Sequence, residues 1–238
     1  MVAGLLGRGA PLVLVPTTLL AQVDAAIGGK AAVNIGGHKN PVGLFAPARD
    51  VITDLDFLGS LDVERLGEGL AEGYKAALLT SEADRAALMN AQRPTVDWVL
   101  RAIETKARIV TADPRESGLR KILNLGHTWG HAVEAASNHR IPHGHAVAIG
   151  IAFIARWSEA RGLLSAEARD RIVADLERLG LPRSTPTELV EPALAHLRAD
   201  KKGGRARVDL VALRGIGRPE IINCSWEGLE RELLELEG

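Results

Sequence analysis

The stretch LNLGHTWGHAVEAASNHRIPHGHAVAIG, residues 123–150, holds five of the seven histidines of the chain. His127 and His131 stand four residues apart, so on a helix their rings share one face. After an intervening loop, His143 can approach the same point. This spacing suits a divalent metal site. It suits equally a pair of partly buried, hydrogen-bonded histidines, because an HxxxH pair alone is only a hypothesis.

A metal site in this chain would have to use histidine and carboxylate ligands. Cys224 is the single cysteine, which excludes an internal disulfide and a multi-cysteine zinc site and fits a reducing compartment. Glu72, in GLAEGYKAALL, is the carboxylate of interest, because the small residues around it let another group approach closely. Glu72 and Lys75 also have the i,i+3 spacing of an ordinary solvated ion pair on a helix. Helix spacing alone favours the ion pair.

The composition predicts a globular protein with no strong charge preference for its partners. The 238 residues are 46% hydrophobic, which is enough for a sizeable core. The net charge of -1 favours neither nucleic acid nor an anionic membrane, so an anionic ligand would need a local cluster of cations. The first residues lack the basic segment of a signal peptide, and the apolar run 146–155 is too short to span a bilayer. We therefore expect a cytoplasmic, enzyme-sized protein.

The residue pattern changes along the chain from short strands to helices. The runs 11–16 and 50–55 predict buried strands, and the glycine-rich stretch 25–47 between them predicts a loop. Beyond Ser60, where we place a boundary, apolar residues at helical spacing predict helices over 63–79, 82–90, 95–112, 128–138, 146–162 and 166–179. Near the end, 206–213 and 217–224 predict a hairpin and 225–238 a closing helix.

Cationic and amide side chains gather before the histidines. If one helical register continues from Arg120 through Asn124 to His127 and His131, all four side chains project to one side, although Gly126 permits a bend. Such a stripe offers a guanidinium, an amide and two imidazoles to an anionic ligand. A solvated polar face is the alternative interpretation.

Six segments resemble a known family when they are read in order along the chain. They are VPTTLLAQVDAAIGGK, GHKNPVGLF, GLAEGYKAALL, DPRESGLRKILNLGHTWGHAVEA, PHGHAVAIG and RADKKG. Together they resemble the 3-dehydroquinate synthase family of the sugar-phosphate cyclase superfamily. Several motifs in one order are far more specific than any one of them, and the resemblance covers nearly the whole chain.

The resemblance implies a role for each matching residue. The metal ligands, for zinc or cobalt, would be Glu72, His127 and His143. The groups around the substrate phosphate would be Lys30, Asn40, Asn124, His131 and Lys201 or Lys202. The groups that hold the substrate carboxylate would be Lys106 and Arg120, and those near its hydroxyls would be Asp24, Lys75 and Glu116. Arg8 would reach the site of a neighbouring subunit in a homodimer. The positions lining the NAD cofactor would be Thr17, Thr18, Lys30, Lys39, Phe57, Leu58, Gly59 and Ser60, with Asp24 beside them.

The resemblance also implies an activity and a fold. The family converts the seven-carbon sugar acid phosphate DAHP into 3-dehydroquinate with loss of phosphate, in the shikimate pathway of aromatic amino acid biosynthesis. It uses NAD to oxidise and re-reduce a ring hydroxyl and a metal as Lewis acid, and His131 would shuttle protons. The fold expected is an α/β remnant of a nucleotide-binding domain, residues 1–60, followed by a mainly α-helical metal- and substrate-binding domain, residues 61–238.

Some features depart from the family pattern and keep alternatives open. The glycine-rich turn that approaches the NAD pyrophosphate lies, in the family, upstream of the segment where this chain begins. We therefore expect the chain to be truncated, its two strands to have exposed edges, and NAD not to bind tightly to it. Ala31 and His145 stand where threonine and glutamate are common, and His145 adds one more imidazole as a possible metal ligand. The alternatives are a sister cyclase acting on another sugar phosphate, a metal-dependent polyol dehydrogenase, or a non-catalytic metal-binding remnant.

Overall fold

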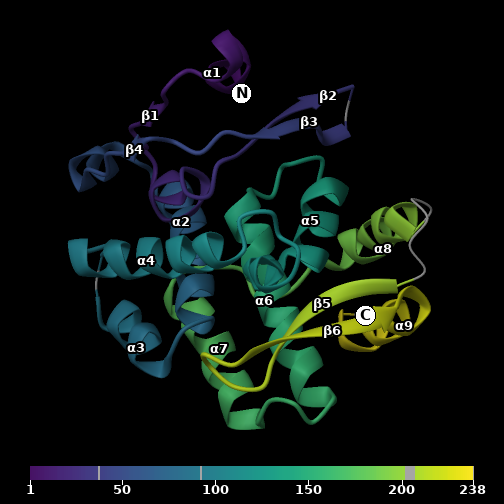
Figure 1. Cartoon of the computed structure of the whole chain (residues 1–238). Helices are drawn as coiled ribbons and strands as arrows, with labels where there is room; N and C mark the ends of the chain where they lie inside the picture. The colour runs from purple at the N-terminus through teal and green to yellow at the C-terminus, as the bar shows by residue number, and fades with distance from the viewer. Residues whose placement is uncertain (37, 92, 202–206, 238) are drawn as a thin grey trace.

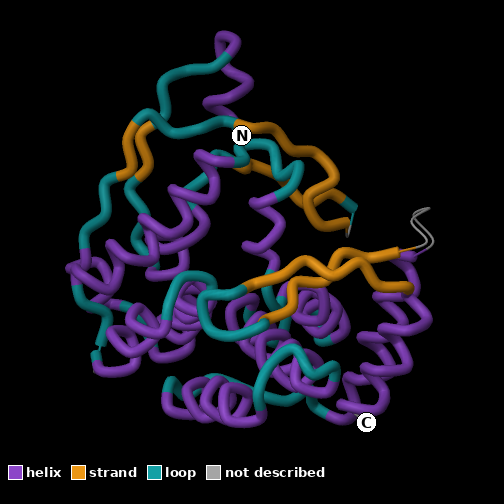
Figure 2. Tube along the Cα trace, turned by 60° about the horizontal axis from the view of Figure 1, so that its bottom comes forward, coloured by secondary structure: helices purple, strands orange, loops and turns teal. Residues whose placement is uncertain are grey.

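The computed structural model describes residues 1–36, 38–91, 93–201 and 207–237. The side chains of Asn34, His38, Lys39, Asn40, Asp200 and Lys201 also lie outside the description. Helices make up most of the described chain, and strands occur as three separate pairs (Figure 2). The first sixty or so residues, purple to blue in Figure 1, lie on one side of the helical body, and the C-terminal hairpin and last helix lie on another.

Six predicted helices are confirmed to within a few residues at each end. They are α2 (Val63–Leu78), α3 (Glu82–Asn90), α4 (Val96–Ala112), α5 (His127–Ala136), α6 (His143–Ala160) and α7 (Ala166–Arg178). Polar side chains begin several of them: Asp62 accepts a hydrogen bond from the backbone N–H of Arg65 at 2.8 Å and so caps α2. A further helix, α8 (Thr187–Lys201), was not predicted. It contains Pro192, a residue that usually interrupts helices.

Helix α6 is the centre of the core. From Ala146 to Ala155 every residue is buried, and Trp157 and Ser158 beyond them are buried too. A helix that is apolar on all sides can be stable only when other elements surround it. Here α2, α5, α7 and α9 (Trp226–Glu237) pack against it, together with the hairpin strand β5 (Arg207–Leu213) (Figure 1).

The C-terminal hairpin and closing helix are confirmed. Strand β5 pairs antiparallel with β6 (Pro219–Ser225), and α9 follows directly. The second half of β5 is buried against the helical body. The backbone N–H of Leu213 donates to Oγ of Ser158 at 3.1 Å, which fastens the hairpin to α6.

The prediction that residues 11–16 and 50–55 form buried strands is wrong in part. Both strands exist, as β1 (Val13–Leu14) and β4 (Asp50–Val51), and they pair in parallel. Both are short, and Val13 and Val51 are 42% and 39% exposed. No other strand in the described part of the chain pairs with them, so the outer edge of each strand lacks a strand partner there, as expected.

The prediction of a loop over residues 25–47 is also wrong. Strand β2 (Lys30–Ile35) pairs antiparallel with β3 (His38–Phe45), with an irregularity between Val33 and Ile35. Val33 and Ile35 are both exposed. Because neither side of this hairpin is fully buried, its sequence lacks the clear apolar–polar alternation that identifies a strand.

The remaining ordered segments are short. They are α1 (Val2–Leu5), the 3-10 helices η1 (Leu6–Arg8), η3 (Leu55–Ser60) and η4 (Leu119–Asn124), and the π-helical turn η2 (Ala21–Ala25). Among the described residues, no helix has the length and hydrophobicity needed to cross a membrane.

Candidate metal and substrate site

Glu72, His127 and His143 converge from three different helices. Nε2 of His127 lies 3.5 Å, and Nε2 of His143 lies 3.4 Å, from the same oxygen of Glu72, Oε1. The rings of His127 and His143 have centroids 5.4 Å apart. Glu72 comes from the middle of α2, whereas the histidines are the first residues of α5 and α6. The expected meeting of an early carboxylate with two much later imidazoles is therefore present.

Local sequence places the two histidines at the starts of their helices. Gly126 precedes α5 with a left-handed φ of 77°, a conformation that glycine adopts without strain. Pro142 precedes α6 in an extended conformation, and its fixed φ suits the residue that leads into a helix. Gly144, the second residue of α6, brings that helix so close to α2 that a Cβ there would lie 2.4 Å from the backbone of Glu68. This close approach sets His143 beside Glu72.

Glu72 is a buried, ionised carboxylate with no hydrogen bond. The residue is 2% exposed, and neither Oε1 nor Oε2 accepts a hydrogen bond in the described structure. Burial alone would raise its pKa, but the positive charge of Lys75 and the neighbouring His127 and His143 hold the pKa well below its usual range. A buried anion of this kind needs a positive partner. The Lys75 ammonium faces Oε2, and Oε1 points between the two imidazoles.

The two imidazoles differ in their surroundings. Burial beside the positive charge of Lys75 lowers the pKa of His127 to about 3, so this ring is neutral. Burial would also lower the pKa of His143, but the carboxylates of Glu134 and Glu72 outweigh it and raise the pKa to about 9. Ligand nitrogens of His127, His131 and His143 lie within 4.8 Å of one another. The cluster therefore offers three imidazoles and one carboxylate to a divalent cation.

The single helical register predicted from Arg120 to His131 does not continue. Residues 119–124 form the 3-10 helix η4, and the bend at Gly126 starts α5 in a new direction. Asn124, His127 and His131 still line one cleft of about 1300 Å³. Arg120 is separated from them and buried. Its guanidinium donates to the carbonyls of Pro114 and Gly28 at 2.7 and 3.0 Å.

Two lysines and Asp24 extend the cluster on the side of η2 and α4. Lys106 donates to the backbone and side-chain oxygens of Asp24 at 2.6 and 2.7 Å, and Lys75 lies 3.7 Å from the same carboxylate. Burial and the charge of Lys75 lower the pKa of Lys106, against the attraction of Asp24. Burial also acts against Lys75, but Glu72 and Asp24 raise its pKa. Alternating charges thus run from Glu72 through Lys75 and Asp24 to Lys106.

A second small network contains Glu116, Lys30 and Asn124. The Asn124 amide donates to Glu116 at 2.9 Å, and the Lys30 ammonium contacts the other Glu116 oxygen. Burial would raise the pKa of Glu116, but the hydrogen bonds from Lys30 and Asn124 lower it. Glu116 has a left-handed φ of 59°. The network brings the hairpin residue Lys30 to the residues that precede α5.

The remaining candidates lie in the first sixty residues or outside the description. Gln22, which is buried, donates to the carbonyls of Pro16 and Asp54 at 3.2 and 2.7 Å, and so ties the segment of Thr17 and Thr18 to η3. η3 contains the expected cofactor positions Phe57, Leu58, Gly59 and Ser60. Arg8 ends η1 and makes no described contact with the histidine cluster. The side chains of Lys39, Asn40 and Lys201, and Lys202 entirely, lie outside the described residues.

Sequence reasoning missed one partner of the cluster and left the role of His145 open. Glu134, on α5, lies 3.0 Å from Nδ1 of His143. Its position seven residues after His127 on one helix was the available signal. His145 was considered as an extra ligand. It instead lies against α2, where a Cβ on Gly67 would be 2.9 Å from its Nε2.

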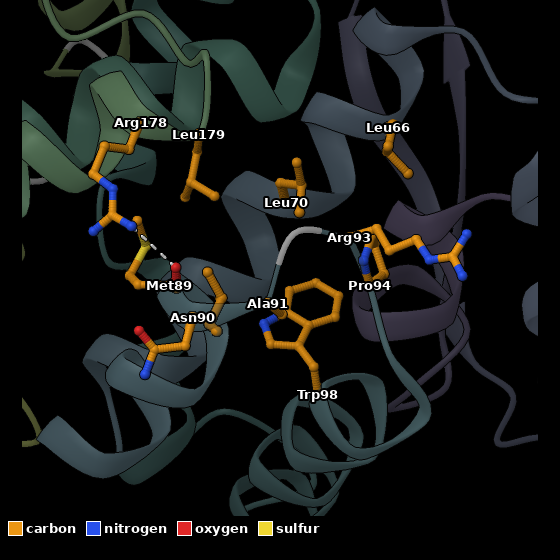
Figure 3. A pocket seen from close by; sticks show the side chains of 11 residues that line it. Leu66, Leu70, Met89, Asn90, Ala91, Arg93, Pro94, Trp98, Arg178 and Leu179 are labelled. Atoms are coloured by element: carbon orange, nitrogen blue, oxygen red, sulfur yellow. Dashed lines mark hydrogen bonds between the residues drawn. The ribbon is translucent and has the colours of Figure 1, made fainter.

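The cleft and a second cavity also contain residues that the sequence did not single out. The walls of the histidine cleft are completed from η4, α8, the C-terminal hairpin and the start of α9 by Lys121, His196, Arg207, Asp209, Asn223 and Trp226. A separate cavity of about 500 Å³ lies between α2, α3, α4 and α7 (Figure 3). Arg178 donates to the carbonyl of Met89 at its edge. None of the predicted site residues whose side chains are described lines this second cavity.

Comparisons with known proteins agree with this geometry. Residues 1–68 match the family described as 3-dehydroquinate synthase N-terminal, and residues 69–203 match 3-dehydroquinate synthase C-terminal. A 3-dehydroquinate synthase from Xanthomonas campestris pv. campestris (strain 8004) is 41% identical over 95% of the chain. The chain spans 65% of the length of that relative.

Solved structures give the same fold. A 2-epi-5-epi-valiolone synthase from Streptomyces hygroscopicus subsp. jinggangensis 5008, with NAD+ and Zn2+ bound, matches with a TM-score of 0.82 and 30% identity over 98% of this chain and 68% of its own. A 2-deoxy-scyllo-inosose synthase complexed with carbaglucose-6-phosphate, NAD+ and Co2+ matches with a TM-score of 0.83 and 24% identity over the same shares of the two chains. The family match, the sequence identity and the fold point to the same family. We conclude that the chain belongs to the 3-dehydroquinate synthase family.

Proposed function

We propose that this chain provides the metal- and substrate-binding part of a 3-dehydroquinate synthase, the lyase that converts DAHP to 3-dehydroquinate with release of phosphate. The observation that carries the proposal is the convergence of Glu72 with His127 and His143, ringed by cationic and amide side chains that match the family motifs. The 41% identical relative supports the same activity.

The proposed metal ligands are Glu72, His127 and His143. Oε1 of Glu72 is buried and accepts no hydrogen bond, whereas Oε2 faces the Lys75 ammonium, so a divalent cation beside Oε1 would supply the missing positive partner. His131 lines the cleft and lies beside the other rings, and we propose that it faces the substrate. Zinc or cobalt held there would act as a Lewis acid on a substrate oxygen.

The cations around the site suit a substrate with two anionic ends. A guanidinium has five N–H donors, and Arg120 uses two of them on backbone carbonyls, so it keeps donors for a carboxylate. Lys106, which contacts Asp24, is proposed as the second group for the carboxylate. Lys30 and Asn124, which both contact Glu116, are proposed to bind the phosphate. The family resemblance adds Asn40, Lys201 and Lys202, whose side chains lie outside the described part of the chain. Fixing both ends orients the substrate for successive steps in one site.

His131 is proposed as the residue that moves protons. Its ring centroid lies 5.1 Å from that of His127, on the cleft side of the cluster. An imidazole at this place can accept a proton from a substrate hydroxyl or return one to a leaving group, since its ordinary pKa is close to neutrality.

The first sixty residues are proposed to be part of an α/β nucleotide-binding domain. The parallel pairing of β1 with β4, across an intervening connection, is typical of that class. NAD would supply hydride transfer, and its contacts would come from Thr17, Thr18, Asp24, Lys30, Lys39 and the segment of η3. We further propose a cytoplasmic homodimer in which Arg8 reaches the partner's site.

A sister cyclase that accepts another sugar phosphate is the second candidate. The solved structures that match most of the chain include a 2-deoxy-scyllo-inosose synthase in complex with a sugar-phosphate analogue. The two candidate functions differ in their substrates. DAHP has a carboxylate, which Lys106 and Arg120 would recognise.

Calorimetric titration of the zinc-loaded protein tests the proposal and separates these candidates. We expect zinc-dependent binding of DAHP, weakened at least about tenfold by Lys106→Met because a charge-assisted contact is lost. Glucose 6-phosphate, which has no carboxylate, should bind more weakly and be insensitive to that change. Substitution of Arg108 by methionine is the matched control, because Arg108 is an exposed cation on the same helix, α4.

Phosphate release from DAHP with added NAD then tests turnover. Absence of any zinc-dependent DAHP binding would refute the proposal, and preference for glucose 6-phosphate would favour the sister cyclase.

A further inference from the structure

The two imidazoles that face Glu72 each have a hydrogen-bond acceptor behind them. Nδ1 of His127 lies 3.0 Å from the carbonyl oxygen of Leu125, and Nδ1 of His143 lies 3.0 Å from Oε2 of Glu134. When the ring is neutral, an acceptor at Nδ1 favours the tautomer that carries its hydrogen there, so that the Nε2 lone pair can bind a cation that displaces the proton. In both rings this Nε2 is the nitrogen that lies near Oε1 of Glu72.

The partner behind His143 differs from that behind His127 in one useful respect. Leu125 acts through its backbone carbonyl, which no substitution removes. Glu134 acts through a side chain, and a carboxylate behind an imidazole also strengthens the basicity of the opposite nitrogen. The contribution of such a partner can therefore be measured at His143.

Glu134 is itself held in place by the turn that joins the two histidine-bearing helices. The residue is 7% exposed. Its carbonyl accepts hydrogen bonds from Oγ of Ser137 at 2.8 Å and from the backbone N–H of His139 at 3.0 Å. Asn138 and His139 both have left-handed φ angles, 51° and 58°, which non-glycine residues seldom adopt. This turn brings Nδ1 of His139 to 3.2 Å from Oε1 of Glu134.

The two oxygens of Glu134 thus have different neighbours. Oε1 faces the exposed His139, whereas Oε2 faces the metal side through His143. A carboxylate anchored at one oxygen and in contact with an imidazole at the other has little freedom to rotate. Joining α5 to α6 does not by itself require a strained turn around a buried carboxylate. The strain therefore fits a turn that holds Glu134 in place.

We propose that Glu134 is a positioning residue of the metal site, whose carboxylate fixes the tautomer and orientation of His143 so that Nε2 points to the cation beside Glu72. The proposal rests on the metal site of the proposed function. It adds a residue that touches neither the cation nor the substrate and acts through His143.

The test compares zinc affinity in Glu134→Gln and in the unchanged chain, by competition with a chelator of known affinity. Glutamine keeps the size of the side chain but loses the charge, and its amide nitrogen can face Nδ1 and oppose the required tautomer. We expect the zinc affinity to fall about 10- to 100-fold, the range found for partners behind metal-bound histidines. Glu104→Gln, an exposed mid-helix glutamate on α4, is the matched control and should leave the affinity unchanged. Equal zinc affinity in Glu134→Gln and the unchanged chain would overturn the proposal.

A second measurement needs no variant and therefore holds even if Glu134→Gln does not fold. Nitrogen-15 chemical shifts of His143 in the zinc-bound protein should show hydrogen on Nδ1 and zinc on Nε2. In a folded Glu134→Gln protein, that pattern should weaken at His143 and persist at His127. Zinc on Nδ1 of His143 in the unchanged chain would overturn the proposal. If the unchanged chain binds no zinc at all, the proposed function fails as well, whereas normal zinc binding with an indifferent Glu134 refutes only this inference.

Discussion

Gly150 is the point where the central helix α6 crosses the turn that precedes His127. A Cβ at Gly150 would lie 1.8 Å from the carbonyl oxygen of Gly126 and 2.7 Å from its carbonyl carbon. Both are backbone atoms that cannot rotate away. The same carbonyl accepts the backbone hydrogen bond of Gly130 at 3.0 Å, in the first turn of α5. Gly150→Ala must therefore push α6 away from the start of α5.

The size of the effect follows from two opposing contributions. An added methyl group in a packed core costs about 1–3 kcal/mol, and a clash with backbone belongs at the upper end. Alanine is better than glycine in a helix by roughly 1 kcal/mol. The net loss should be about 2 kcal/mol, which lowers the melting temperature of a chain of this size by roughly 4–8 °C. Because His127 begins the displaced helix, zinc affinity should fall as well.

Thermal unfolding and zinc titration of the same sample measure both consequences. Gly228→Ala is the matched control, since Gly228 lies in α9 and a Cβ there meets only Oγ of Ser225 at 3.0 Å, which can rotate. The control should be neutral or slightly stabilised. A Gly150→Ala protein with an unchanged melting temperature and unchanged zinc affinity would show that the close crossing does not hold the site.

Three further substitutions test other parts of the structure. Tyr74→Phe removes a buried hydroxyl that donates to Asp175 at 2.9 Å and should cost about 1–3 kcal/mol in urea unfolding; no loss would mean that the bond contributes nothing. Asp113 accepts backbone hydrogen bonds from Arg120 and its neighbours, which lower its pKa, so its stabilisation is present above about pH 4 and is lost as the pH falls below that value. Asp113→Asn should flatten the pH dependence of unfolding between pH 7 and pH 3, and an unchanged profile would contradict this assignment. Glu72→Gln should lower zinc affinity by more than about 100-fold, a larger effect than loss of a partner behind a ligand, and retained affinity would exclude Glu72 as a ligand.

The helical body could be predicted from the sequence because its helices carry their own signals. Apolar spacing and capping residues such as Asp62 mark the start and extent of α2. The same reasoning failed for the hairpin of β2 and β3, where Val33 and Ile35 are both exposed. It failed also for the burial of β1 and β4. Burial depends on which elements lie beside a strand, and local sequence does not contain that information.

The metal cluster was predicted in outline, and its surroundings were not. The i,i+4 spacing placed His127 and His131 on one face, and the motif resemblance added Glu72 and His143. The stripe through Arg120 failed because the left-handed bend at Gly126 breaks the register, a bend that the sequence permitted but did not require. Glu134 was missed because its contact with His143 depends on the turn between α5 and α6. Asn138 and His139 have left-handed φ angles in that turn; both residue types tolerate this conformation better than most, but their presence in a sequence does not require it.

The geometry of the cluster depends on how the helices pack. Glycines bring the backbones together at two crossings, Gly144 against Glu68 and Gly150 against Gly126, and these contacts place the three ligand-bearing helices around one point. In small zinc-binding domains the ion supplies the folding energy. Here a core of apolar helices around α6 holds the helices together, and a cation bound between Glu72 and the imidazoles would offset a buried charge and supply chemistry. It follows that the free energy of metal binding reflects how well these packed helices preorganise the ligands, and that substitutions at the glycine crossings act on the metal through the core.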